Sequence, residues 1–209
     1  MADYETDDEK VEAIKKWWKE NGVSVVAGLA IGLTAVFGWR FWVDYRESVG
    51  QQASTAFEQL MITAEGEDTA AALAQAQAVR DGFGSTAYAS LADLMEARVK
   101  LKTGDTAGAI AALERVMTKA PDPALSRIAG LRLARVLLDQ GDLDRAGTIA
   151  AKYADDGSFG GDFAAIQGDI AASQGRYVEA RQAYERALTT GASLSQLIQL
   201  KLDNLPAAG

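Results

Sequence analysis

An uncharged apolar run near the N-terminus, residues 23–39, constrains the fold of this chain more than any other feature. The chain's tryptophans flank it, at positions 17, 18, 39 and 42. Tryptophan favours the membrane–water interface, because its ring is apolar while its N–H needs a polar partner. A helix from Val23 to Val43 would span roughly 31 Å, close to the thickness of a bilayer core. The sequence therefore predicts one transmembrane helix, over residues 22–43.

The charges beside this run predict its orientation. Lysine precedes it at positions 10, 15, 16 and 19, whereas only Arg40 and Arg46 follow it closely. The lysine-rich side of a span stays in the cytoplasm, and acidic residues contribute little to this rule. We therefore expect residues 1–21 to form a cytoplasmic tail and residues 44–209 to form a domain on the far side of the membrane.

Two other interpretations of the run are weaker. A cleaved signal peptide has an apolar region of about 7–15 residues followed by a small-residue cleavage site. Here the run is longer and ends in the bulky residues 38–42, Gly-Trp-Arg-Phe-Trp. A buried helix of a soluble core would not need a pair of tryptophans at each end.

Composition excludes several classes of function. Seven of the 29 acidic and five of the 21 basic residues lie in residues 1–43, so residues 44–209 hold 22 and 16, a net charge of −6. A domain this acidic is unsuited to nucleic acid or to an anionic bilayer surface. The chain has no Cys and no His, which removes disulfides, thiolate metal sites and Ser-His-Asp or zinc chemistry. We expect no cofactor, no metal and no catalytic residues.

Glycine and alanine recur in a fixed register after residue 100. Each of Gly104, Gly141 and Gly175 is followed five residues later by alanine, and these glycines are 37 and 34 residues apart. A period near 34 is typical of tetratricopeptide repeats (TPR), which are stacked pairs of antiparallel helices. Glycine permits the tight turn within a pair, and alanine lets the two helices cross closely.

Other positions follow the same register. Small residues stand seven before each glycine, and core-type residues stand nine and twelve after it: Ala97, Ala134, Gly168; Leu113, Ala150, Tyr184; Val116, Tyr153, Ala187. A weaker copy begins with a helix at about 44–64 and has Gly66 followed by Ala71. Residues 193–204 suit a final helix that caps the stack. The predicted fold is all-α: a transmembrane helix, a TPR-like solenoid and a C-terminal capping helix.

Several segments together resemble one known family. These are DEKVEAIKKWWKENG before the span, GWRFW at its end, GLRLARVLL at 130–138 and LSQLIQLKLDNL at 194–205. The chain is similar to the YfgM family over almost its whole length. The resemblance implies an ancillary subunit of the SecYEG translocon, anchored in the inner membrane of a Gram-negative bacterium. It also implies a periplasmic TPR domain, association with a membrane-anchored, PpiD-like periplasmic chaperone, and no enzymatic activity.

The repeat register also indicates a partner-binding face. A TPR stack curves, and the first helix of each pair lines its concave side. We expect that face to include Leu94, Arg98, Lys102, Leu131, Arg135 and Leu138. Arg98 and Arg135 are equivalent in adjacent repeats and would suit an acidic segment of a partner. Solvated helix surface with local salt bridges is the alternative interpretation.

Two further features have modest significance. Gly28 and Gly32 form a G-xxx-G pair, which would let another membrane helix approach closely. The acidic glycine-rich stretch 155–162 lacks the ligand pattern of a calcium-binding EF-hand, and we interpret it as a loop between repeats.

Three functions are compatible with these features to different degrees. The leading hypothesis is a membrane-tethered adaptor beside the Sec translocon that links it to chaperones and assists translocated polypeptides. A TPR scaffold for envelope or cell-division assembly is a second. A membrane-anchored hydrolase with paired carboxylates is a third, and no motif in the sequence favours it.

Overall fold

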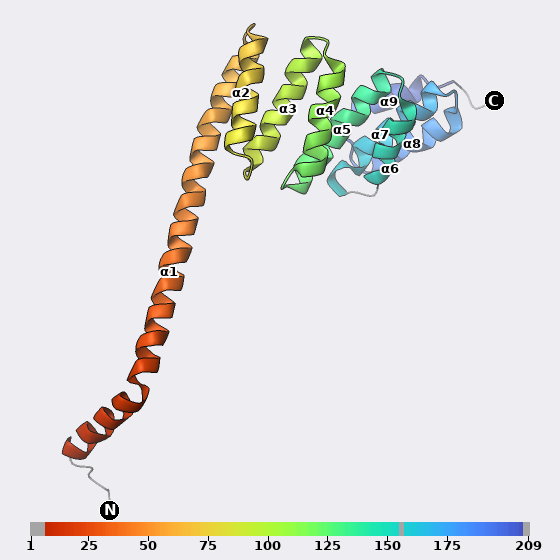
Figure 1. Cartoon of the computed structure of the whole chain (residues 1–209). Coiled ribbons are helices and arrows are strands. Elements are labelled where there is room, and N and C mark those ends of the chain that lie inside the picture. Colours follow the sequence, from red (N-terminus) through yellow and green to blue (C-terminus); the bar gives the residue numbers. More distant parts are fainter. Residues whose placement is uncertain (1–6, 155–156, 207–209) are drawn as a thin grey trace, which may run out of the picture. The chain divides into compact units, whose positions relative to one another are not determined.

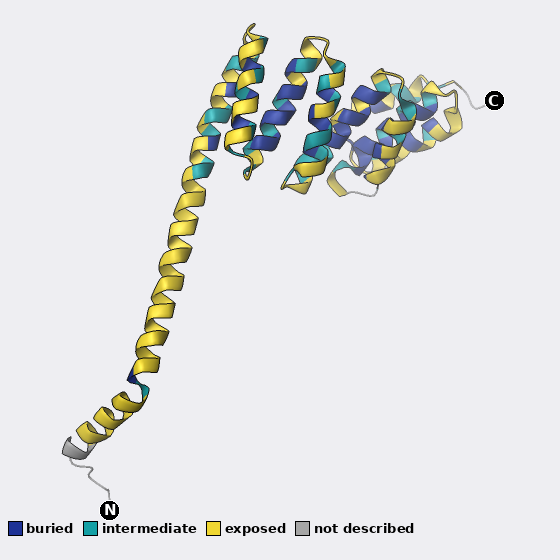
Figure 2. Cartoon of the chain, viewed as in Figure 1, coloured by how far each residue is buried: buried dark blue, intermediate teal, exposed yellow. Residues whose placement is uncertain are grey.

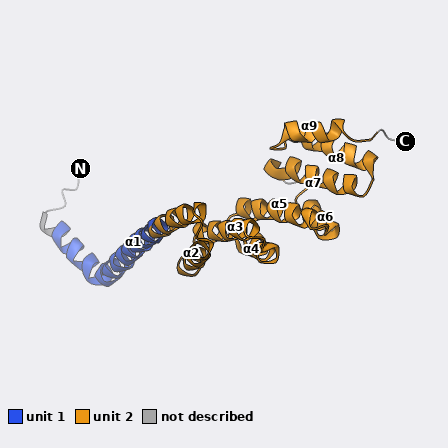
Figure 3. Cartoon of the chain, turned by 90° about the horizontal axis from the view of Figure 1, so that it is seen from above, with its two compact units in different colours: residues 1–51 blue, residues 52–209 orange. Residues whose placement is uncertain are grey.

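The computed structural model describes residues 7–154 and 157–206, and every element within them is helical (Figure 1). The helices are α1 Asp7–Glu65, α2 Thr69–Gly82, α3 Ala87–Lys102, α4 Thr106–Lys119, α5 Pro123–Asp139, α6 Leu143–Lys152, the 3-10 turn η1 Gly157–Phe159, α7 Gly160–Ser173, α8 Tyr177–Thr189 and α9 Ser195–Asp203. The predicted all-α fold is confirmed. The chain divides into two compact units, Met1–Gln51 and Gln52–Gly209 (Figure 3).

The first unit holds the predicted membrane span. Within the described residues, α1 alone is long and apolar enough to cross a bilayer. Its large apolar side chains are exposed along the span, for example Leu29, Ile31 and Phe37 (Figure 2). Apolar side chains exposed along a whole helix suit a lipid surrounding. The predicted boundaries at residues 21/22 and 43/44 fall inside α1 and stay predictions.

In the second unit the glycine–alanine register is confirmed. Gly104, Gly141 and Gly175 have φ angles of +83°, +77° and +72°, a conformation that side chains with a Cβ rarely adopt. The alanines five residues after them, Ala109, Ala146 and Ala180, are completely buried. The helix pairs α3–α4, α5–α6 and α7–α8 therefore turn and cross where the repeat pattern places them.

The weaker first copy exists, but its register is shifted by one residue. Its buried alanine is Ala72, whereas Ala71 is exposed. The helix start explains the shift, because Asp68 caps α2 by accepting from the N–H of Ala71, as Asp105 and Asp142 cap α4 and α6. Counted from the capping residue, Ala72 is equivalent to Ala109. Residues 53–63 of α1 supply the first helix of this pair, and Leu60 packs with Ala76, Val79 and Ala92.

A cluster of five charges joins the first repeats. Asp93 and Glu96 on α3 are nearly buried, and Arg80 of α2 and Arg115 of α4 bind both of them at 2.5–3.0 Å. Lys100 adds a contact of 3.0 Å to Glu96. Each carboxylate is thus paired and hydrogen-bonded, which is the condition for burying it without a large cost.

This cluster predicts a pH dependence of stability. Burial opposes ionisation of Glu96, but the hydrogen bond from Lys100, the charge of Arg115 and the hydrogen bond from Arg80 outweigh it and lower the pKa of Glu96 below its ordinary value of 4.5. Its contribution is therefore fully present above pH 4.5 and lost as pH falls through the lowered pKa. Denaturant titrations between neutral pH and pH 3 should show a smaller acid-induced loss of stability in Glu96→Gln than in the wild type. Glu114→Gln, in an exposed pair with Arg145, should keep the wild-type slope.

Candidate partner-binding groove

A groove of about 440 Å³ lies between α3 and α5, which are the first helices of two successive pairs. Its floor is apolar and its edge carries three arginines; the lining residues are Leu94, Ala97, Arg98, Leu101, Leu113, Arg132, Arg135 and Val136. On α5 the residues Arg132, Arg135 and Val136 are three and four positions apart and so share one helix face. We call this the arginine groove.

The charges of the arginine groove are mostly uncompensated. Arg98 and Arg132 are exposed, and in the described part of the chain neither is within ion-pair distance of a carboxylate. Arg135 is different, because its Nη2 lies 3.4 Å from Oδ1 of Asp162 on α7. Asp162 is 2% exposed and also accepts a hydrogen bond of 2.7 Å from the hydroxyl of Ser193. Two free guanidinium groups therefore border an apolar floor in an otherwise acidic domain.

The six residues expected on the concave face occupy four kinds of position. Leu94, Arg98 and Arg135 line the arginine groove. Leu138 lines a neighbouring groove, and Lys102 is exposed on α3 outside both linings. Leu131 is 8% exposed and belongs to the core.

Sequence reasoning missed Arg132 and Leu101. The equivalent of Arg132 in the preceding repeat is Met95, so a search for repeated basic positions passes over it. A helical wheel of α5 places Arg132 one turn before Arg135 and would have found it.

The neighbouring groove has a volume of about 320 Å³ and lies between α5, α7 and α9. Its apolar lining is Leu138, Ala165, Ile166, Leu194, Leu197 and Ile198, and its polar lining is Arg135, Asp139, Asp162, Asp169 and Lys201. We call this the leucine groove. Arg135 lines both grooves, so they meet at α5.

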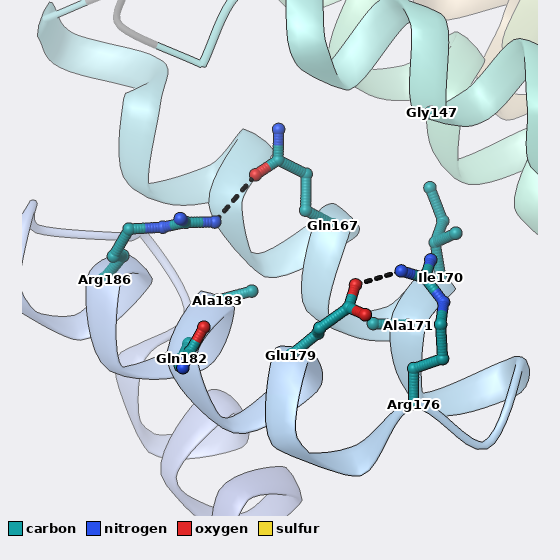
Figure 4. Close-up of a pocket in the computed structure, with 9 residues that line it drawn as sticks. All are labelled: Gly147, Gln167, Ile170, Ala171, Arg176, Glu179, Gln182, Ala183 and Arg186. Atoms are coloured by element: carbon teal, nitrogen blue, oxygen red, sulfur yellow. Dashed lines mark hydrogen bonds and ion pairs between the residues drawn. The ribbon is translucent and has the colours of Figure 1, made fainter.

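A third hollow, of about 300 Å³, lies among α6, α7 and α8 on the side of the second helices (Figure 4). Its polar groups bind one another: Arg176 pairs with Glu179, and Arg186 donates to Gln167 at 3.0 Å. Because these groups are already paired, the hollow offers less to a ligand than the arginine groove.

Two sequence features remain. A Cβ added at Gly28 or Gly32 would meet nothing within 4 Å, so the role of this pair in helix packing stays a prediction. The stretch 155–162, expected to be a loop, is helical from residue 157: η1 covers Gly157–Phe159, and residues 160–162 begin α7 and bring Asp162 to the leucine groove. Asp155 and Asp156 lie outside the described residues. Within the described residues, no group of three or more acidic, His or Cys side chains is able to bind a metal.

Comparison with known proteins shows the family. A family model described as a tetratricopeptide repeat-like domain matches residues 15–207. An "Ancillary SecYEG translocon subunit" of Haemophilus influenzae is 31% identical over 200 residues, which are 95% of this chain and 97% of that protein. The chain belongs to the family of ancillary SecYEG translocon subunits. The resemblance to the YfgM family is thereby confirmed.

Two other members of this family match over shorter stretches. Proteins of the same name from Escherichia coli K12 and Aggregatibacter actinomycetemcomitans are 34% and 30% identical over 58 and 96 residues. These stretches are 28% of both chains in the first case, and 46% of this chain and 47% of the relative in the second. No solved structure gives a significant match to this chain.

Proposed function

We propose that this protein is a non-catalytic TPR adaptor, anchored by α1 in the bacterial inner membrane and associated with the Sec translocon. The similarity to a translocon subunit over 95% of the chain carries this proposal. A single membrane helix joined to a stack of helix pairs supports it, because that architecture holds a protein-binding surface beside a membrane complex.

In this proposal residues 44–209 are periplasmic and hold a PpiD-like chaperone, and through it translocated polypeptides, near the translocon exit. Tethering to the membrane raises the local concentration of a weak binder without requiring new contacts. The arginine groove is the proposed docking surface, because free guanidinium groups around an apolar floor favour an acidic partner segment.

The proposal is tested by purifying the tagged full-length chain from native membranes in mild detergent and quantifying partners by mass spectrometry. Translocon subunits should be enriched over an unrelated single-span protein expressed at the same level. Recovery of translocon subunits at the level of that control would overturn the proposal.

The orientation gives a separate prediction. Because lysines concentrate before α1's apolar run, protease added to spheroplasts should digest residues 44–209. Immunoblotting for a C-terminal tag measures the loss, with an intact cytosolic protein as the control for membrane sealing. A C-terminal domain that stays protected in spheroplasts and is cut only after lysis would reverse the assignment.

The arginine groove predicts a charge effect on partner capture. Arg98→Glu should lower the amount of docked partner that is recovered at low salt. Because salt screens exposed charges, the difference in recovery between this variant and the wild type should be smaller at high salt. Lys102→Glu, one turn away on α3 but outside the groove lining, is the matched control and should have the smaller effect. Arg135→Glu is unsuitable for this test, because it would place a second carboxylate beside the buried Asp162.

A further inference from the structure

The C-terminal helix α9 leaves a row of leucines open. Ile198 is buried, and Leu202 and Leu205 pack against the core formed by α7 and α8. The other leucines of this segment are exposed: Leu194 by 50%, Leu197 by 45% and Leu200 by 58%. A helix that only capped the stack would present a polar outer face. Its exposed leucines therefore need an explanation other than folding.

Polar contacts fix this helix in place. Nζ of Lys201 lies 2.6 and 2.8 Å from the two carboxylate oxygens of Asp169, which also accepts a hydrogen bond of 2.7 Å from the hydroxyl of Tyr184. At the start of α9, Ser193 donates to the buried Asp162. These contacts fix α9 so that Leu194 and Leu197 line the leucine groove, whereas Leu200 lies outside its lining.

The two grooves have different chemistry and meet at α5. The arginine groove carries the charges of Arg98 and Arg132, which are exposed and have no ion pair in the part of the chain that the structure describes. In the leucine groove, Arg135 and Lys201 are neutralised by Asp162 and Asp169. Asp139 at the edge formed by α5 adds a carboxylate that has no ion pair within the described residues, and the rest of the lining is apolar. One side of α5 therefore attracts carboxylates, and the other side offers contact to apolar side chains.

We propose that the two grooves form one binding site for a single acidic, leucine-containing segment of a partner protein. Its carboxylates bind Arg98 and Arg132, and its apolar side chains lie against Leu194 and Leu197. This deepens the proposed function, because it rests on the arginine groove being the docking surface and states which partner segment binds there.

The packing of the helices sets the spacing within that segment. Grooves on either side of one helix are separated by about one interaxial distance, roughly 8–10 Å. An extended chain covers this distance with about three residues, and a helix with about six. The acidic and the apolar residues of the partner should therefore be about three positions apart in an extended segment, or about six in a helical one.

A second copy of this chain is a weaker candidate for the occupant. Three half-exposed leucines offer far less than the roughly 800 Å² per partner that a stable interface buries. The unpaired charges of the arginine groove are positive, so a second copy of the same face would add repulsion rather than complementarity.

The test uses the full-length chain in nanodiscs and a short fluorescent peptide with two glutamates and two leucines at the predicted spacing. Fluorescence anisotropy measures its Kd. A peptide with lysine in place of glutamate, and one with serine in place of leucine, should each bind about tenfold more weakly or worse. Leu194→Ser with Leu197→Ser, and Arg98→Glu with Arg132→Glu, should each weaken binding of the first peptide about tenfold.

The matched controls lie on the same helices. Leu200→Ser on α9 and Lys102→Glu on α3 should change the Kd by about twofold or less, because neither side chain lines a groove. Circular dichroism should show wild-type helicity for each variant, because the substituted side chains lie at the surface. Leu194 and Leu197 are the least exposed of the substituted leucines, and about half of each is still exposed.

Equal binding of the glutamate and lysine peptides would overturn the inference. An equal loss of affinity in Leu200→Ser and in Leu194→Ser with Leu197→Ser, the leucine-groove variant, would also overturn it. Concentration-dependent dimer formation that the leucine-groove variant abolishes, without peptide binding, would assign the face to a second copy instead. Translocon recovery with the same variants separates the two proposals. If translocon subunits are recovered normally but the peptide does not bind, only the stated partner segment is rejected. If the wild-type protein does not recover translocon subunits, the adaptor function is rejected.

Discussion

Phe163→Ala is expected to lower the free energy of unfolding by about 3–5 kcal/mol. The Phe163 side chain on α7 is completely buried, and its ring stacks on that of Tyr153 with centroids 5.0 Å apart. Tyr153 follows α6, so this contact joins two successive helix pairs, and truncation would leave a cavity at their junction. The core cannot fill that space without moving a whole helix pair.

Chemical denaturation of the full-length chain in detergent, followed by circular dichroism, measures this effect. The exposed Leu200→Ala is the control and should stay within about 0.5 kcal/mol of wild type. A change below about 1 kcal/mol in Phe163→Ala would mean that the pairs α5–α6 and α7–α8 do not share the packed junction described above.

Leucine at the helix crossings should destabilise each repeat by overpacking. Ala109→Leu, Ala146→Leu and Ala180→Leu each introduce a larger side chain at a completely buried position, at an expected cost of about 1–3 kcal/mol. Gln182→Leu on the exposed face of α8 adds a leucine without burial and should change stability little. Thermal melts compare the variants. Similar melting temperatures for all of them would contradict the repeat register.

The repeat register could be predicted because both of its signals are local. Gly104 and Ala109 are determined by one turn and one helix crossing, which recur with the repeat. In the first repeat copy the buried alanine lies one residue later than the glycine register predicts. Its position has a fixed distance from the capping Asp68, not from Gly66. A capping aspartate is thus a better reference point for such a degenerate repeat than the glycine before it.

Long-range polar contacts could not be predicted in this way. The charge cluster joins Asp93 to Arg80 and Arg115, which are 13 and 22 residues away in the chain. The partner of Arg135 is Asp162, 27 residues further on. These pairings depend on how successive helix pairs rotate against each other. The sequence therefore indicated an arginine-bearing face, but not which arginines are free to bind a partner.

In the proposed function, a small membrane-anchored protein acts at a translocon by binding alone. The helices α3 and α5 combine apolar surface with the positive charges of Arg98 and Arg132, which have no ion pair within the described residues, in a domain of net negative charge. Such a site selects by charge and spacing, and weak binding suffices when the membrane helix already places the domain near its partner.

Site-specific photocrosslinking in native membranes tests the central claim most directly. A photoreactive amino acid replaces Leu101, which is 40% exposed and lines the arginine groove, or the exposed Gln182 on α8, which lines the hollow among α6, α7 and α8. The account predicts crosslinks from position 101 to a translocon subunit or to a chaperone bound there, and none to these proteins from position 182. Crosslinks to them from position 182, with none from position 101, would contradict it.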